Sequence, residues 1–180
     1  MHSGSTQATA RAARALLLML LVAAECGAAE QLTPSASAPV APACALAIAD
    51  EAKVSELADY RGQVVYVDFW ASWCGPCRQS FPFMNQLQSE LGAQGLAVVA
   101  LNLDEEASDA ASFLAKHAAS FKIAGGANQA CAQAFQVEAM PSSYLIDRAG
   151  KVRYIHHGFR AGDAEQLRAL ATTLLAEPAP

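Results

Sequence analysis

Residues 64–77, VVYVDFWASWCGPC, carry the signals that decide how this chain folds. Residues 64–69 are apolar and rich in β-branched side chains, which predicts a short buried strand. One acid, Asp68, lies inside that strand. A Trp-containing turn follows, and the sequence CGPC then leads into a segment with helical character. A strand, a turn and a helix thus meet at a pair of cysteines.

The two cysteines, Cys74 and Cys77, have the spacing of a redox pair. We expect both on the first turn of a helix, where a small disulfide closes with little backbone movement. The free N–H groups and the positive dipole end of the helix favour a thiolate at Cys74. Gly75 and Pro76 keep the loop tight, and proline is tolerated because first-turn N–H groups have no partner inside the helix. We predict that Cys74 attacks a substrate disulfide and that Cys77 resolves the mixed disulfide.

A single CxxC pair is also compatible with half of a zinc site. The sequence has no second CxxC and no histidine pair at ligand spacing, so we expect no metal and no cofactor. Asp68 is the other candidate for chemistry. A carboxyl group inside an apolar strand is costly to desolvate, which predicts a raised pKa. Such a group can accept the proton of Cys77. The alternative is an exposed acid at the end of the sheet.

The 180 residues suggest one domain plus a tail, and the length is sufficient for a hydrophobic core. The formal charge is −5 at pH 7 and there is no basic run, which argues against nucleic acid as a partner. The cysteines do not have the pattern of a disulfide scaffold. They are Cys26, Cys44, Cys74, Cys77 and Cys131.

The first 29 residues are expected to be a signal peptide. Arg11 and Arg14 precede the apolar residues 15–24, which are too few to span a bilayer as an ordinary helix. Small residues at 27–29 suit cleavage. The alternative is a lipoprotein anchored at Cys26, but Glu25 fits poorly the small residue that such a signal needs. Export to the periplasm is therefore expected, where structural disulfides persist.

Residues 30–43 are rich in Pro, Ala and Ser, and we predict a flexible linker there. Residues 44–177 are expected to form the domain. A helical turn at 55–60 would be capped by Ser55. Strands are predicted at 64–69, 96–103, 121–123, 142–146 and 152–157, and helices at 74–92, 107–118, 128–135 and 163–175. Pro82 lies inside the first helix and should kink it. The predicted fold is α/β, a mixed sheet with helices on both faces.

Two segments resemble a known family. The stretch DFWASWCGPC is similar to the active-site segment of thioredoxins, and MPSSYLID, beginning at Met140, resembles the cis-proline segment of the TlpA/ResA-like (DsbE-like) branch. The resemblance covers residues 42–175. It implies a thioredoxin fold with a TlpA-type β/α insertion at 104–126. Asp68 matches the buried acid of thioredoxins. Ser80 stands where some ResA-like proteins have a glutamate that tunes the thiols, so that role is absent here.

The resemblance also implies a substrate-binding rim. A cis bond before Pro141 would present the Met140 backbone to an extended substrate chain. Trp73, Gly75 and Pro76 would lie at the same rim, whereas Trp70 is assigned to packing. For Cys44 and Cys131 two alternatives stay open, a structural disulfide or two buried thiols. His156 and His157 point to opposite faces of a strand, so at most one lies near the site.

The sequence thus predicts an exported thiol–disulfide oxidoreductase that reduces protein disulfides. The resemblance implies a DsbD/CcdA-like membrane electron donor, and a role in cytochrome c maturation or in reduction of metal-site cysteines. Two alternatives are a metal- or haem-handling chaperone on the same fold and a peroxiredoxin-like peroxidase. The copper chaperones use three residues between their cysteines, not two. The peroxidase needs Thr and Arg around its cysteine, a motif that surrounds none of Cys74, Cys44 and Cys131.

Overall fold

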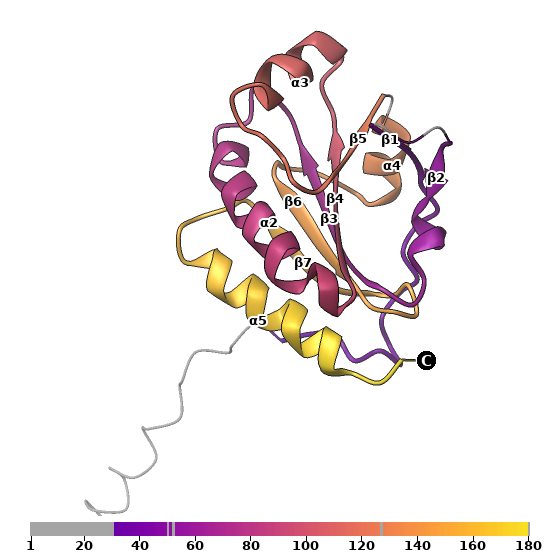
Figure 1. Ribbon diagram of the computed structural model, residues 1–180. Coiled ribbons are helices and arrows are strands. Elements are labelled where there is room, and N and C mark those ends of the chain that lie inside the picture. The colour runs from indigo at the N-terminus through magenta and orange to yellow at the C-terminus, as the bar shows by residue number, and fades with distance from the viewer. Residues whose placement is uncertain (1–30, 50, 52, 127, 180) are drawn as a thin grey trace, which may run out of the picture. The chain divides into compact units, whose positions relative to one another are not determined.

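The computed structural model describes residues 31–179 except 50, 52 and 127. These residues form a seven-stranded mixed sheet in the order β2-β1-β5-β4-β3-β6-β7 (Figure 1). The strands are β1 (Ala45–Ile48), β2 (Ser55–Glu56), β3 (Val64–Trp70), β4 (Leu96–Asn102), β5 (Lys122–Gly125), β6 (Ser142–Ile146) and β7 (Val152–His157). The helices are α2 (Cys77–Leu91), α3 (Ala107–Leu114), α4 (Gln129–Ala134) and α5 (Asp163–Ala176), with short 3-10 turns η2 (Leu57–Tyr60) and η3 (Gly92–Gln94).

Strand β3 is the centre of the sheet. It pairs in parallel with β4 and antiparallel with β6, and all its residues are buried. A strand covered on both faces needs a continuous apolar run, which is the pattern that the sequence shows. The predicted α/β class, with a mixed sheet and helices on both faces, is confirmed.

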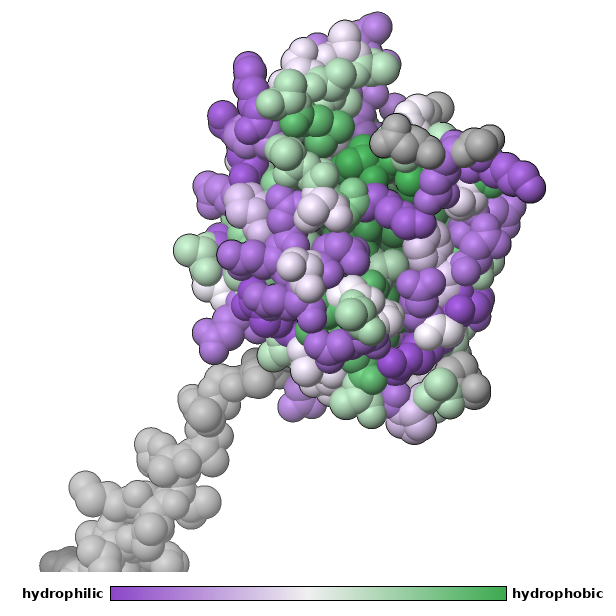
Figure 2. Space-filling model, viewed as in Figure 1, coloured by the Kyte–Doolittle hydropathy of each residue, from purple (hydrophilic) through white to green (hydrophobic). Residues whose placement is uncertain are grey.

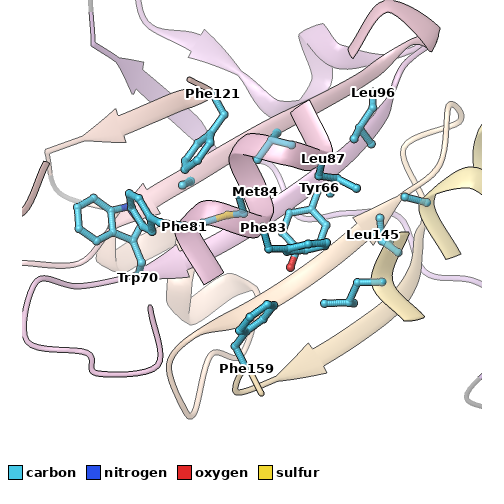
Figure 3. Close-up of a cluster of buried hydrophobic side chains, with 14 of the residues drawn as sticks. Tyr66, Trp70, Phe81, Phe83, Met84, Leu87, Leu96, Phe121, Leu145 and Phe159 are labelled. Carbon is cyan, nitrogen blue, oxygen red and sulfur yellow. The ribbon is translucent and has the colours of Figure 1, made fainter. Parts of the chain in front are cut away.

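The two faces of the sheet carry separate cores. Tyr66 and Trp70 point to the face that α2 and α5 cover, whereas Val67 and Phe69 point to the face with α4. Figure 1 shows α2 and α5 together on one side of the sheet. Figure 3 shows that Phe81 and neighbouring residues of α2 reach toward the side chains of β3. Because side chains alternate along a strand, neighbouring residues of β3 serve different layers.

Helix α2 differs from the prediction at its start. It begins at Cys77 and not at Cys74, and Pro76 occupies the N-cap position. Pro82 lies inside the helix, which continues to Leu91. Helix α3 and strand β5 occupy the expected insertion, and α3 ends at Leu114, four residues earlier than predicted.

The segment 31–43 also differs from the prediction of a flexible linker. The Thr33 N–H donates to the Arg153 carbonyl at 2.8 Å, and the Val152 N–H donates to the Pro39 carbonyl at 2.8 Å. The Ala41 N–H donates to Gly150 at the β6–β7 turn, at 2.9 Å. The segment therefore supplies backbone partners to β7, which is the last strand of the sheet. An edge strand has unpaired backbone N–H and carbonyl groups along one side. The composition of residues 31–43 does not reveal that this segment binds them.

The helical turn η2 has a different cap from the one predicted. The turn begins at Leu57, and the backbone N–H of Glu56 donates to the Asp59 carboxylate at 2.8 Å. The Ser55 hydroxyl instead donates to Glu51 at 2.8 Å. Ser55 is part of β2, whose pairing with β1 moves it away from the cap position.

Hydrophilic residues cover most of the face shown in Figure 2, and hydrophobic side chains gather beside α3 and β5. A surface groove there is lined in part by Ile48, Leu114, Phe121 and Ile123. Among the described residues no helix is both long and apolar enough to cross a bilayer. The expected signal peptide and the alternative anchor at Cys26 lie outside the described residues.

A disulfide joins Cys44, just before β1, to Cys131 in α4. The two Cα atoms are 5.4 Å apart, and both residues are buried. Of the two alternatives for these cysteines, the structure has the bridge. The bond closes a loop between residues 87 positions apart in sequence and fastens α4 to the sheet.

Replacing both Cys44 and Cys131 by Ser is expected to lower the free energy of unfolding by about 2–4 kcal/mol, because a long loop is no longer closed in the unfolded chain. Urea unfolding of the oxidised protein measures the change. The matched control replaces Cys74 and Cys77, whose bond closes a loop of only three positions and should matter less to loop entropy. An equal loss of stability in both variants would contradict the expectation.

Candidate active site

The site lies where β3 ends. The chain leaves β3 at Trp70 and reaches the helix α2 through residues 71–76. The register pairs Phe69 with Ser142, so Pro141 lies at the same end of the sheet as this loop. Two segments that are far apart in sequence are thereby brought together, as the resemblance implied.

Cys74 and Cys77 form a disulfide across this loop, with their Cα atoms 5.3 Å apart. Cys74 lies in a turn ahead of α2, and the Cys77 N–H points to its sulfur at an N–S distance of 3.2 Å. The first helical N–H thus favours negative charge on Cys74 once the pair is reduced. Cys77 is fully buried, whereas Cys74 keeps 4% of its surface exposed. Of the two thiols, Cys74 is the one a partner can reach.

The loop before Cys74 is held by a buried carboxylate. Asp104 accepts hydrogen bonds from the Ser72 N–H, at 3.0 and 3.1 Å, and from the Ser72 hydroxyl at 2.9 Å. The Asn102 amide donates to the same carboxylate at 2.7 Å, and the Asn128 amide donates to the Asn102 carbonyl at 2.9 Å. Since Ser72 is two residues from Cys74, this network fixes the path of the chain into the redox pair.

The two tryptophans differ in exposure. Trp70 is completely buried, with its ring centroid 4.9 Å from those of Phe81 and Phe113. Trp73 is 70% exposed, directly beside Cys74. Gly75 and Pro76 complete the loop between the cysteines. An exposed indole next to a reactive thiol offers apolar contact area to a partner.

The Met140–Pro141 peptide bond is cis. The Pro141 carbonyl accepts a hydrogen bond from the Gly158 N–H at 2.7 Å, which ties this loop to the end of β7. Met140 is half-buried and packs against the core cluster that contains Cys74 and Cys77. The loop and the redox pair therefore share one hydrophobic cluster.

Asp68 is fully buried in β3, on the same face as Tyr66 and Trp70. Burial raises the pKa of Asp68 to about 7, although the hydrogen bond from Ser143 lowers it. The Ser143 hydroxyl donates to Oδ1 at 2.6 Å, and Oδ2 has no hydrogen-bond partner among the described residues. A carboxyl group with a pKa near neutrality can take up and release a proton at ordinary pH.

Other polar residues around the site have structural partners. The buried Ser80 hydroxyl donates to the Cys77 carbonyl at 3.1 Å. His157 Nδ1 lies 3.0 Å from the Ser142 hydroxyl, whereas His156 Nε2 lies 3.1 Å from Asp163. Across the described part of the chain no three His, Cys, Asp or Glu residues group as a metal site would require.

Sequence reasoning missed Ser72, Asp104 and Ser143. Asp104 directly follows β4, which runs parallel to β3, so the two strands end at the same edge of the sheet. This position could have indicated that Asp104 lies near the loop after β3. Ser143 lies directly across from Asp68, but only the β3–β6 register reveals that pairing. Both partners depend on contacts between distant parts of the sequence.

Comparisons with known proteins match this architecture. The sequence profile of the Redoxin family matches residues 35–171. The chain is 33% identical over 108 residues to "Thiol-disulfide oxidoreductase ResA" of Geobacillus thermodenitrificans, covering 60% of this chain and 62% of that protein. It is 34% identical over 102 residues to the protein of that name from Bacillus thuringiensis strain Al Hakam, covering 57% and 59%. The chain thus spans about three-fifths of the length of these relatives.

One solved structure is matched over nearly its whole length. It is described as a putative thiol:disulfide interchange protein DsbE from Chlorobium tepidum and superposes with a TM-score of 0.73. The identity is 47%, over 77% of this chain and 97% of that one. The predicted thioredoxin fold is thereby confirmed. The profile, the sequence relatives and the superposition agree that the chain belongs to the Redoxin family, as a TlpA/ResA/DsbE-like member of the thioredoxin superfamily.

Proposed function

We propose that the protein is an exported thiol–disulfide oxidoreductase that reduces disulfides of other proteins. The observation that carries the proposal is the Cys74–Cys77 pair at the start of α2, on the same side of the sheet as a buried acid with a pKa of about 7. The relatives named as thiol-disulfide oxidoreductases support the same activity. Cys74, Cys77 and Asp68 are the proposed catalytic groups.

The reduced pair carries out two exchanges. The Cys74 thiolate attacks one sulfur of the substrate disulfide, and the other substrate sulfur leaves as a thiolate and takes up a proton. Cys77 then gives its proton to Asp68 and attacks the Cys74 sulfur. This step forms the Cys74–Cys77 disulfide and releases the second substrate sulfur, which accepts a proton. Two electrons pass from the protein to its substrate.

Substrate binding is assigned to the rim of the site. The exposed Trp73 supplies apolar contact, and Gly75 and Pro76 lie on the accessible loop between the two buried cysteines. The backbone at Met140, before the cis-Pro141 bond, would pair with that chain as an added strand. Specificity would come from the side chains that fit between Trp73 and Met140.

Turnover requires a donor of two electrons, because each cycle leaves the pair oxidised. A DsbD/CcdA-like membrane donor is the proposed source, in line with export by the segment at residues 1–29. Cytochrome c maturation and reduction of metal-site cysteines are the proposed settings. The Gly-Pro dipeptide between the cysteines supports the reducing direction, since it is the pair found in reducing thioredoxins.

The reduction potential of the Cys74–Cys77 pair is expected near that of thioredoxin, about −270 mV. Equilibration of the full chain in dithiothreitol buffers, followed by alkylation of free thiols, measures it. The double variant Cys44→Ser, Cys131→Ser leaves Cys74 and Cys77 as the disulfide that is titrated. A potential near that of DsbA, about −120 mV, would make the protein an oxidant and contradict the reducing direction.

Replacing Cys77 by Ser is expected to trap substrate as a mixed disulfide on Cys74, because the resolving thiol is lost. Cys74→Ser should abolish turnover and trap nothing. Non-reducing gel electrophoresis with a disulfide-containing protein substrate distinguishes the two variants. Full turnover by Cys77→Ser would contradict the assignment of the resolving thiol.

Replacing Asp68 by Asn is expected to slow reduction near neutral pH and to stabilise the fold. The folded pKa of about 7 exceeds the value of 3.8 for a free Asp, so the folded state holds an extra proton between these values. Wild-type stability therefore falls as the pH rises through this window. We expect the variant to exceed wild type by about 2–4 kcal/mol at pH 8 and to match it near pH 4.

Urea unfolding of the oxidised wild-type and Asp68→Asn proteins at pH 4 and pH 8 tests whether the difference in stability appears only at the higher pH. A stability difference that is the same at pH 4 and pH 8 would mean that Asp68 has an ordinary pKa. A pH–rate profile identical to that of wild type would exclude Asp68 as the proton acceptor.

A further inference from the structure

Three buried side chains form a continuous hydrogen-bonded series on the face of the sheet that carries the hydrophobic cluster with Cys74 and Cys77. The Tyr66 hydroxyl donates to the Ser143 hydroxyl oxygen at 2.7 Å, and the Ser143 hydroxyl donates to Asp68 Oδ1 at 2.6 Å. Tyr66 and Asp68 have no exposed surface and Ser143 has 2%. Tyr66 and Asp68 are two residues apart on β3, and Ser143 faces Asp68 from β6. The sheet register itself therefore aligns the three groups.

The hydrogen bonds run in one direction, from Tyr66 through Ser143 to Asp68. Each hydroxyl group has one proton to donate, and a carboxylate can only accept. With Asp68 ionised, Ser143 must donate to it, and Ser143 then has lone pairs left for the Tyr66 proton. Oδ1 is thus occupied by a donor, and Oδ2 is the oxygen without a partner among the described residues.

We propose that Ser143, supported by Tyr66, is a positioning residue that sets the proton affinity of Asp68 and directs the incoming proton to Oδ2. The inference rests on the proposed function, in which that proton comes from Cys77. Neither hydroxyl touches the reacting sulfurs. Their effect on the reaction passes through Asp68 alone.

Two opposing effects set the pKa of Asp68: its burial and the hydrogen bond that it accepts from Ser143. Burial disfavours the charged carboxylate, and a hydroxyl donor at 2.6 Å favours it. Hydrogen bonds to charged groups are roughly twice as strong as those between neutral groups. A second donor, Tyr66, polarises the Ser143 hydroxyl and strengthens its bond to Oδ1. Without the hydrogen bond from Ser143, the pKa of Asp68 would rise further, and a smaller fraction of Asp68 would be ionised and able to accept a proton at neutral pH.

Few other ionisable groups among the described residues face Tyr66, Ser143 and Asp68. Tyr154 of β7 and Asp163 at the start of α5 act on Tyr66, whose pKa burial raises well above its usual value. Tyr66 therefore stays protonated and remains a donor at neutral pH. From α2 the ionisable group is Cys77, the resolving thiol of the proposed cycle, and from β4 the apolar Ala100 lies opposite Asp68. No cation among these groups competes with Ser143 for the carboxylate.

The test is a direct titration of Asp68 in the full chain, with the Cys74–Cys77 pair oxidised. Carboxyl-labelled aspartate gives a ¹³C NMR signal whose shift reports the protonation of Asp68, and Asp68→Asn identifies that signal. The variants are Ser143→Ala, which removes the donor, Ser143→Thr, which keeps a hydroxyl on a strand-compatible side chain, and Tyr66→Phe.

The titration midpoint of Asp68 should rise by about one pH unit in Ser143→Ala, since the loss of a hydrogen bond to a charged group amounts to a factor of at least ten. Tyr66→Phe should raise the midpoint by less, and Ser143→Thr should restore it to the wild-type value. The pH–rate profile of mixed-disulfide resolution should move in the same direction. In an Asp68→Asn background, Ser143→Ala should leave that profile unmoved.

A midpoint that is equal in wild type and Ser143→Ala would overturn the proposal. If Ser143→Ala does not fold, an unmoved midpoint in Tyr66→Phe overturns it in its place. Because the titration is measured without turnover, it stands apart from the proposed activity. A wild-type protein that reduces no protein disulfide, yet shows the predicted shifts, would refute the proposed function and leave the proton-affinity role of Ser143 supported.

Discussion

A carboxyl group with no counter-charge in the middle of the central strand is the constraint on which this structure depends. Asp68 has no exposed surface, and among the described residues its hydrogen-bond partner is Ser143. Such a group is tolerated only where the backbone around it is fixed on both sides, because a shift of one residue would turn it to the other face. The β3–β4 and β3–β6 pairings provide that rigidity. The apolar strands thus hold in place the carboxyl group that we propose as the proton acceptor.

Much of the fold could be predicted because its central strands are continuous apolar runs. The predicted bounds of β6 and β7 agree with the structure, and those of β3 and β4 differ by one residue at one end. Errors arose where contacts between distant segments decide the outcome. The segment 31–43 lacks charge and periodicity, yet its backbone bonds to β7. The start of α2 was misplaced because the loop before it is held by Asp104, 32 residues away from Ser72.

The residues of the candidate site also differ in whether the local sequence could predict them. Cys74, Cys77 and Asp68 were found because each stands out against its own neighbours in the sequence. Ser143 does not stand out, since a serine at the start of a predicted strand gives no sign of which residue lies across from it. Its importance appears only when β6 is placed beside β3, in register with Asp68. Local pattern therefore identifies the proposed catalytic groups, and strand register identifies the hydrogen-bond partner of Asp68.

The two disulfides belong to opposite sides of the sheet. Cys74 and Cys77 are part of the cluster under α2 and α5, and Cys44 and Cys131 are part of the cluster under α4. The sheet therefore separates the two disulfides, and each lies in the hydrophobic cluster of its own face. In the proposed cycle, electrons pass through the Cys74–Cys77 pair and leave the Cys44–Cys131 bond intact. One bond would then open and close in every cycle while the other keeps α4 joined to the segment before β1.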